Sequence, residues 1–198
     1  MNSKLLVGFT FSSSVLSQKI NGFRLRYDAK YFSQPNLVMS LCRPFVIDSN
    51  DENELIGDLS DELESFLFGH EANLSLSFTG IDIFAHGKNK ILYFNPIMPD
   101  PIEHCAESLD DITRSFIYDK DQKYRNDTNK LFLPIASIFE NNQIDTAVNT
   151  ARFEFDFPLE LPLASVSLFK KRGSHWYERE VLHPFVDASN RFLQMGAS

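Results

Sequence analysis

The residues of this chain whose types and spacing best suit chemistry are two serines in apolar runs. Ser40 lies in the run from Asn36 to Phe45, and Ser137 lies in the run from Leu131 to Phe139. Short apolar runs bounded by polar residues are typical of buried strands. A serine hydroxyl in such a strand either binds a ligand or makes a hydrogen bond within the core. The sequence keeps both interpretations open.

A hydrophobic residue precedes each serine by two positions. Because side chains alternate along a strand with period two, we expect Val38 to share a face with Ser40, and Ile135 to share one with Ser137. We expect both runs to be central strands of a sheet that line one cleft. Valine and isoleucine cannot exchange a proton, so neither position can supply a general acid or base.

Arg43 and Tyr31 complete the set of candidate ligand-binding residues. Arg43 follows Ser40 by three positions in an otherwise apolar run, and buried arginines are normally paired. The corresponding residue after Ser137 is Glu140. Two interpretations follow: an ion pair between Arg43 and Glu140 that fills the cleft, or an Arg43 guanidinium that binds a phosphate. Tyr31 supplies an aromatic ring on which a nucleobase can stack.

These segments, and the order of elements around them, resemble the 2H phosphoesterase superfamily, also called the LigT-like or 2',5' RNA ligase-like family. In that family two H-x-T/S motifs on pseudo-symmetric strands grip one phosphodiester. The first motif is typically followed by a Pro-Phe pair, as here at Pro44 and Phe45, and the second is typically preceded by a proline, as here at Pro134. Both family histidines are replaced in this chain, by Val38 and Ile135.

The resemblance implies a fold for the whole chain. It predicts an α+β structure in which two pseudo-symmetric lobes of mostly antiparallel sheet, with outer helices, surround a central cleft. The likeness in order and spacing covers nearly all of the sequence. We therefore expect residues 1–198 to form a single 2H phosphoesterase-like domain of two lobes.

The functional consequence follows from the replaced histidines. In the family they act as general base and general acid, and each such group contributes roughly 10²–10⁴ to a rate. None of the chain's own histidines restores an H-x-T/S motif; they are His70, His86, His104, His175 and His183. The sequence does not decide whether the chain is an enzyme, and it favours a catalytically degenerate protein.

The resemblance implies that the ligand is a nucleotide or an RNA terminal phosphate. The expected ligand-binding residues are Ser40, Ser137, Arg43 and Tyr31, and we expect no metal or other cofactor. Two alternatives stay open. One is an active 2',3'-cyclic or 2',5'-phosphodiesterase that uses non-standard residues, and the other is a structural role or the binding of a protein partner.

The composition of the chain limits the kinds of partner and the cellular compartment that we expect. The net charge of −8 gives no general attraction to a polyanion, so we expect no DNA-binding patch. No run approaches the roughly 18 apolar residues of a membrane span, and the run after Lys4 is shorter than a signal-peptide core. Because Cys42 and Cys105 are too few for a disulfide framework, we expect reduced, buried thiols in a cytoplasmic protein.

The periodicity of apolar residues predicts the remaining elements. A helix over 51–68 carries carboxylates on what we expect to be a solvated face. Asp100 is predicted to be the N-cap of a helix that ends near Ile117. We also expect a helix that begins after Ser12 or Ser13 and another over 142–151. The predicted further strands cover 5–11, 74–84, 90–95, 153–157, 164–169 and 176–185.

Overall fold

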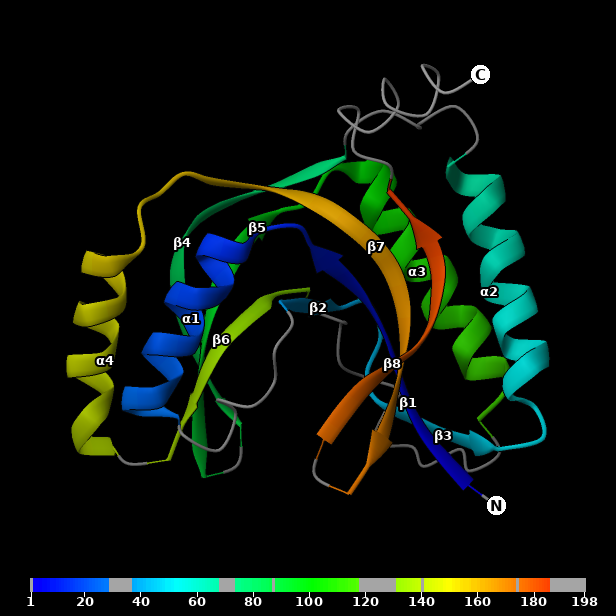
Figure 1. The fold of residues 1–198 in the computed structure, drawn as a ribbon, viewed down its shortest axis with the longest axis horizontal. Helices are drawn as coiled ribbons and strands as arrows, with labels where there is room; N and C mark the ends of the chain where they lie inside the picture. The colour runs from blue at the N-terminus through cyan, green and yellow to red at the C-terminus, as the bar shows by residue number, and fades with distance from the viewer. Residues whose placement is uncertain are drawn as a thin grey trace, which may run out of the picture.

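The computed structural model describes residues 2–28, 37–67, 74–86, 88–117, 131–139, 141–173 and 175–185. Figure 1 shows these residues as a curved sheet with helices packed near both of its ends. The elements follow one another in the order β1 (Asn2–Phe11), α1 (Ser14–Tyr27), β2 (Val38–Ser40), β3 (Phe45–Asp48), α2 (Glu52–Leu67), β4 (Ser75–His86), β5 (Asn89–Ile97), α3 (Asp100–Ser115), β6 (Leu133–Ile138), α4 (Asn141–Glu154), β7 (Leu159–Arg172) and β8 (His175–Pro184).

The described strands form one sheet in which neighbouring strands pair antiparallel. The strand order is β2-β1-β7-β4-β5-β6, with β3 also paired to β1 and β8 also paired to β7. The two serine strands, β2 and β6, are therefore the ends of this order, and the prediction that they are central strands is wrong. They nevertheless contact each other, because the sheet curves strongly (Figure 1). Curvature of the sheet brings the two serine strands together.

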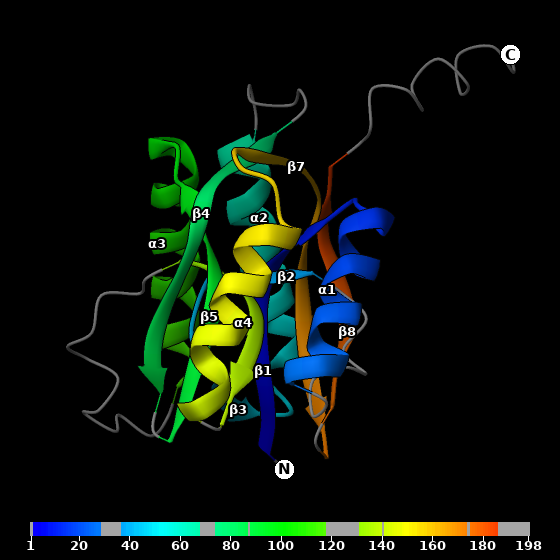
Figure 2. The same cartoon turned by 90° about the vertical axis from the view of Figure 1, so that its left-hand side faces the viewer.

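The helices cover the sheet in two pairs. Helices α1 and α4 lie beside β4 and β6, whereas α2 packs on α3 and contacts β8 (Figures 1 and 2). In α2 the apolar side chains of Leu55, Leu59 and Leu63 recur at helical spacing and are at most 1% exposed. Apolar residues from all four helices join those of the strands in one core cluster. The predicted α+β fold with a mostly antiparallel sheet is confirmed.

The first serine run is shorter as a strand than the sequence predicted. It divides into β2 and β3, which pair with two successive parts of β1. Between them, the Leu41 N–H still donates to the carbonyl of Val7 at 2.9 Å. The chain leaves the ladder before Pro44, which lacks an N–H to donate. Ser40 is therefore the last residue of a three-residue strand.

The alternating segment 153–157 is not a strand, which corrects the prediction. Helix α4 continues to Glu154, and Phe153 at its end is 89% exposed. Phe155 and Phe157 instead pack edge-on against Phe94, with ring centroids 5.0 and 5.4 Å apart. The alternation thus reflects aromatic packing after a helix end, and β7 begins only at Leu159.

The start of α3 also differs from the prediction by one residue. Pro99 is the N-cap, with extended backbone angles and no side-chain capping bond. Asp100 lies in the first turn, where a carboxylate is favoured by the helix dipole.

Candidate ligand-binding site

One face of the sheet carries a group of hydroxyls beside β2. Residues directly opposite each other on antiparallel strands point to the same face. Strand β1 places Gly8 opposite Ser40 of β2 and opposite Ser167 of β7, and it places Thr10 opposite Ser165. The alternate residues of β1 belong to the helix-covered core. The hydroxyl face, as we call it, is defined by Ser40, Thr10, Ser165 and Ser167.

Val38 lies on this hydroxyl face, as the sequence predicted, because it is opposite Thr10. Its Cγ1 is 2.7 Å from the position that a Cβ on Gly8 would take, and the carbonyl oxygen of Met39 is 2.9 Å from that position. Real Cβ atoms do not approach other atoms so closely, so only glycine lets β2 lie this close to β1. Gly8 therefore sets the position of the Ser40 strand.

Three of the four hydroxyls form a hydrogen-bonded chain. Thr10 Oγ1 lies 2.7 Å from Ser165 Oγ, which in turn lies 2.7 Å from Ser167 Oγ. These residues are 9%, 7% and 0% exposed, respectively. Ser40 is half-buried and its hydroxyl makes no side-chain hydrogen bond within the described residues. These three hydrogen-bonded hydroxyls were not predicted, although serines at alternate positions of the run 163–168 were a signal for them.

Ser137 has different surroundings from Ser40. Its backbone N–H donates to Oδ2 of Asp28, and its Oγ accepts a 2.9 Å hydrogen bond from Nδ2 of Asn89. Asp28 follows α1 and is 5% exposed, while Asn89 is the first residue of β5. The backbone N–H of Ser137 and its Oγ, as an acceptor, are therefore each bonded to another element of the fold.

A bulge in β6 interrupts the alternation on which the sequence prediction for this strand depended. The register with β5 shifts between Leu92 and Tyr93, which leaves Ile135 opposite no residue of β5. Ile135 is 0% exposed and belongs to the core, whereas Ser137 is half-buried. Ile135, two positions before Ser137, is thus a core residue.

Arg24 of α1 binds the carbonyl groups at this bulge. Its Nε donates to the Ile135 carbonyl at 2.9 Å, and an Nη donates to the Pro134 carbonyl at 3.2 Å. Arg24 is 7% exposed. Burial lowers the pKa of its guanidinium, and the charge of Asp28 acts in the opposite direction. Arg24 and Asp28 together tie α1 to the backbone of β6.

Arg43 is half-buried between β2 and β3, and its charge acts on Asp110 of α3. Burial raises the pKa of Asp110, while the charges of Arg114 and Arg43 oppose that shift. Tyr31 and Glu140 lie outside the described residues. The predicted pair of Arg43 with Glu140 and the stacking role of Tyr31 therefore stay predictions.

The histidine side chains that the structure describes lie away from the hydroxyl face. His183 is opposite Val166, a residue of the helix-covered core, and its ring centroid is 5.3 Å from that of Phe185. His104 is exposed on α3, and His175 begins β8 opposite Arg172. None of these three imidazoles is placed to act at Ser40.

A pocket of about 280 Å³ lies at one end of the hydroxyl face. Its volume is near the lower end of the roughly 300–1,000 Å³ that ligand pockets occupy. It combines hydroxyls, one carboxylate and apolar side chains. The residues that line it are Thr10, Phe11, Ser17, Leu37, Ser165, Glu178 and Val181.

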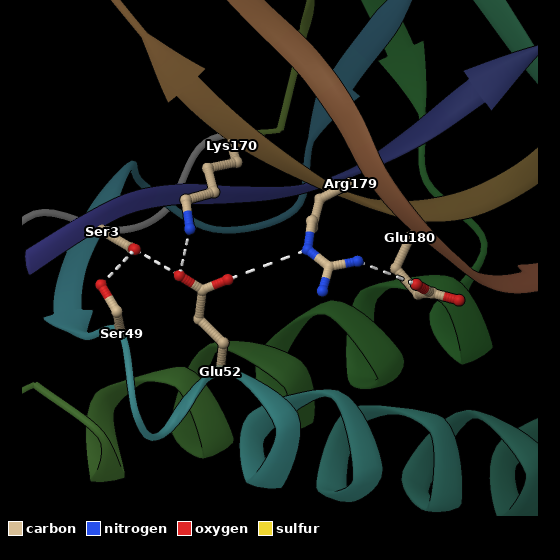
Figure 3. Close-up of polar contacts among 6 residues, drawn as sticks. All are labelled: Ser3, Ser49, Glu52, Lys170, Arg179 and Glu180. Carbon is tan, nitrogen blue, oxygen red and sulfur yellow. Dashed lines mark hydrogen bonds and ion pairs between the residues drawn. The ribbon is translucent and has the colours of Figure 1, made fainter.

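A separate ionic cluster lies on the opposite, helix-covered side of this sheet region (Figure 3). Glu52, in the first turn of α2, accepts hydrogen bonds from Ser3 and Lys170, and its Oε2 is 3.9 Å from Nε of Arg179. Burial raises the pKa of Glu52, but the hydrogen bonds of Lys170 and Ser3 and the charges of Lys170 and Arg179 outweigh it, so the pKa is lowered. This cluster joins α2 to β1, β7 and β8.

The two cysteines are free and buried, as the sequence predicted. Burial raises the pKa of Cys42 and of Cys105 to about 12. In the part of the chain that the structure describes, no helix has the length and apolar character needed to cross a membrane.

Solved structures of other proteins share this architecture over nearly the whole chain. LigT from E. coli complexed with 3'-AMP matches with a TM-score of 0.58 at 12% identity, covering 91% of this chain and 97% of LigT. The chain has the LigT fold. LigT complexed with ATP matches with a TM-score of 0.56 at 8% identity, covering 91% of this chain and 96% of that one.

A second protein with the LigT fold is Usb1 from Kluyveromyces marxianus. It matches with a TM-score of 0.54 at 12% identity, covering 88% of this chain and 96% of Usb1. No protein-family model and no curated protein sequence matches the chain. The LigT-like fold predicted from the order of elements is thereby confirmed, and at this level of identity the likeness concerns the fold alone.

Proposed function

We propose that this protein binds a nucleotide or an RNA terminal phosphate where β2 and β6 meet, without the two-histidine chemistry of the 2H family. The observation that carries the proposal is the contact between these two strands in a LigT fold, with the half-buried Ser40 hydroxyl unbonded to other described side chains. LigT itself has been solved with 3'-AMP and with ATP. Those complexes support a nucleotide as the class of ligand.

The side chains at the two histidine positions support a binding role over catalysis. Val38 lies on the hydroxyl face and Ile135 lies in the core, and neither can exchange a proton. The described imidazoles lie elsewhere. Ser40 is the serine whose hydroxyl has no side-chain partner among the described residues, whereas Ser137 Oγ accepts a hydrogen bond from Asn89 and has only its own proton to offer a phosphate oxygen.

The test is the thermal unfolding midpoint in the presence of 2',3'-cyclic nucleotides, 2'- and 3'-nucleotides and 2',5'-linked dinucleotides. A ligand at about 100 times its Kd adds roughly 2.7 kcal/mol to stability, and each kcal/mol raises Tm by roughly 2–4 °C for a chain of this size. We expect a shift with at least one compound that disappears in Ser40→Ala and persists in the control Ser115→Ala, which changes an exposed serine of α3.

Two outcomes would contradict the proposal. A Tm that no compound changes would favour a protein partner or a structural role instead. Hydrolysis of a 2',3'-cyclic or 2',5'-linked substrate by the purified protein, followed by chromatography of the products, would establish the active phosphodiesterase.

A further inference from the structure

We infer that the pocket beside Thr10 holds the uncharged nucleoside part of the bound nucleotide, with Thr10 as a hydrogen-bond donor and Glu178 as an acceptor. This inference rests on the proposed function, which places the phosphate at Ser40. Three features of the described residues support it: the direction of the hydroxyl chain, the chemistry of the pocket wall and the position of the pocket relative to Ser40.

The number of protons in the hydroxyl chain makes Thr10 a donor. Each hydroxyl has one proton to donate. Ser167 is 0% exposed, and within the described residues its hydroxyl bonds only to Ser165. An unused buried donor is strongly unfavourable, so Ser167 donates to Ser165, and Ser165 donates to Thr10. The proton of Thr10 is then free to be donated into the pocket that Thr10 lines.

Another residue of the pocket wall, Glu178, selects against a phosphate. Glu178 is exposed on β8, and its carboxylate accepts hydrogen bonds but cannot donate them when ionised. Its negative charge repels a phosphate and favours the N–H of a base or the O–H of a sugar. Phe11, Leu37 and Val181 supply apolar surface for the face of a ring. The pocket therefore suits a neutral nucleoside with both donors and acceptors.

The separation between the pocket and Ser40 is short enough for one nucleotide to reach from one to the other. Thr10 is opposite Val38, and Ser40 is opposite Gly8, so Thr10 and Ser40 are diagonal neighbours on adjacent strands. Such residues are about 7–8 Å apart. A single nucleotide can bridge this separation with its phosphate at Ser40 and its sugar or base in the pocket. A volume of about 280 Å³ leaves room for about one nucleoside in the pocket.

The experiment measures Kd by titration calorimetry for adenosine, cytidine, guanosine and uridine and for their 3'-monophosphates. We expect Thr10→Val and Glu178→Gln each to weaken both the preferred nucleoside and its monophosphate by roughly tenfold. Ser40→Ala is expected to weaken only the monophosphate. Thr10→Ser keeps the donor and should retain wild-type affinity. The matched controls are Thr79→Val, an exposed threonine of β4, and Glu180→Gln, which lies opposite the core residue Leu168.

The outcomes separate this inference from the proposed function. If Ser40→Ala abolishes monophosphate binding while Thr10→Val and Glu178→Gln change neither Kd, the inference that the pocket binds the nucleoside is wrong. The proposal that the phosphate binds at Ser40 is then supported. If the two pocket variants weaken nucleoside binding while Ser40→Ala leaves monophosphate binding unchanged, the pocket binds the nucleoside. The proposal that the phosphate binds at Ser40 is then wrong. If the wild-type protein binds neither the nucleosides nor the monophosphates, both are overturned.

Discussion

The two serine strands occupy corresponding places in the sequence but have different surroundings in the structure. Ser40 ends a three-residue strand and makes no side-chain hydrogen bond within the described residues. Ser137 lies within a six-residue strand, where Asp28 and Asn89 bind its N–H and its Oγ. Similar sequence segments can therefore differ in structure: one serine hydroxyl has no side-chain partner among the described residues, while the other serine is bonded to Asp28, which follows α1, and to β5.

The physical cause of this difference is the way in which each strand is held. Strand β2 is positioned by close backbone approach to Gly8. Strand β6 carries a bulge, and its carbonyl groups are bonded by the buried Arg24. Side-chain hydrogen bonding thus stabilises the Ser137 strand, and steric fit sets the position of the Ser40 strand.

The largest effect is expected when the polar contacts of the Ser137 strand are removed. Arg24→Ala leaves two bulge carbonyls without their donor and Asp28 without a buried cation, so we expect the free energy of unfolding to fall by about 3–5 kcal/mol. Urea denaturation measures this change. The control Arg26→Ala removes a pair with Glu154 in which the arginine side chain is 49% exposed, and it should cost less than about 1 kcal/mol. Equal effects of both variants would show that β6 does not depend on Arg24.

The corresponding test of the Ser40 strand is Gly8→Ala. The added Cβ would lie 2.7 Å from Val38 Cγ1 and 2.9 Å from the Met39 carbonyl oxygen, so we expect a loss of about 1–3 kcal/mol in urea denaturation. Gly57→Ala in α2 is the matched control, because no atom lies within 4 Å of its added Cβ. That variant should stabilise the protein by about 0.5–1 kcal/mol. A neutral Gly8→Ala variant would mean that close approach does not position β2.

The Glu52 cluster tests whether side-chain ion pairs also stabilise the region around β1. The pKa of Glu52 is lowered in the folded state. The Glu52 carboxylate therefore contributes stability above its unfolded pKa of about 4.3. That contribution is lost as the pH falls through the folded pKa. We expect Tm to fall more steeply below about pH 4.3 in the wild type than in Glu52→Gln. If Tm falls with pH equally in the two proteins, the ionised Glu52 carboxylate does not stabilise the fold.

The smallest effects on stability separate the two serines directly. Ser137→Ala removes the hydrogen bond from Asn89 and should cost about 1 kcal/mol, whereas Ser40→Ala should change stability by less than about 0.5 kcal/mol. Urea denaturation of each variant measures these two changes in stability. Ligand binding should show the reverse order, with Ser40→Ala the more damaging change. A greater loss of stability in Ser40→Ala than in Ser137→Ala would contradict the comparison.

Much of the fold could be predicted from the sequence because the signals are local. Apolar periodicity indicated α2 and the β4–β5 hairpin, and the order of elements indicated the LigT fold. The predictions of individual strands were wrong where long-range packing, and not the local pattern of apolar residues, sets the structure. The alternating residues 153–157 join a helix end and an aromatic cluster around Phe94, and the run that contains Ser40 divides because β1 pairs with two separate segments.

The sequence by itself determined that Val38 and Ile135 cannot act as acid or base, because this depends only on side-chain chemistry. The tertiary structure decided where each candidate residue lies. Ile135 is in the core because of a bulge against β5, and Ser137 is bonded by Asp28, which lies 109 residues earlier in the chain. The hydroxyl chain joins Thr10 to Ser165 across 155 residues of sequence. Such partners are set by strand pairing and helix docking, which no local pattern specifies.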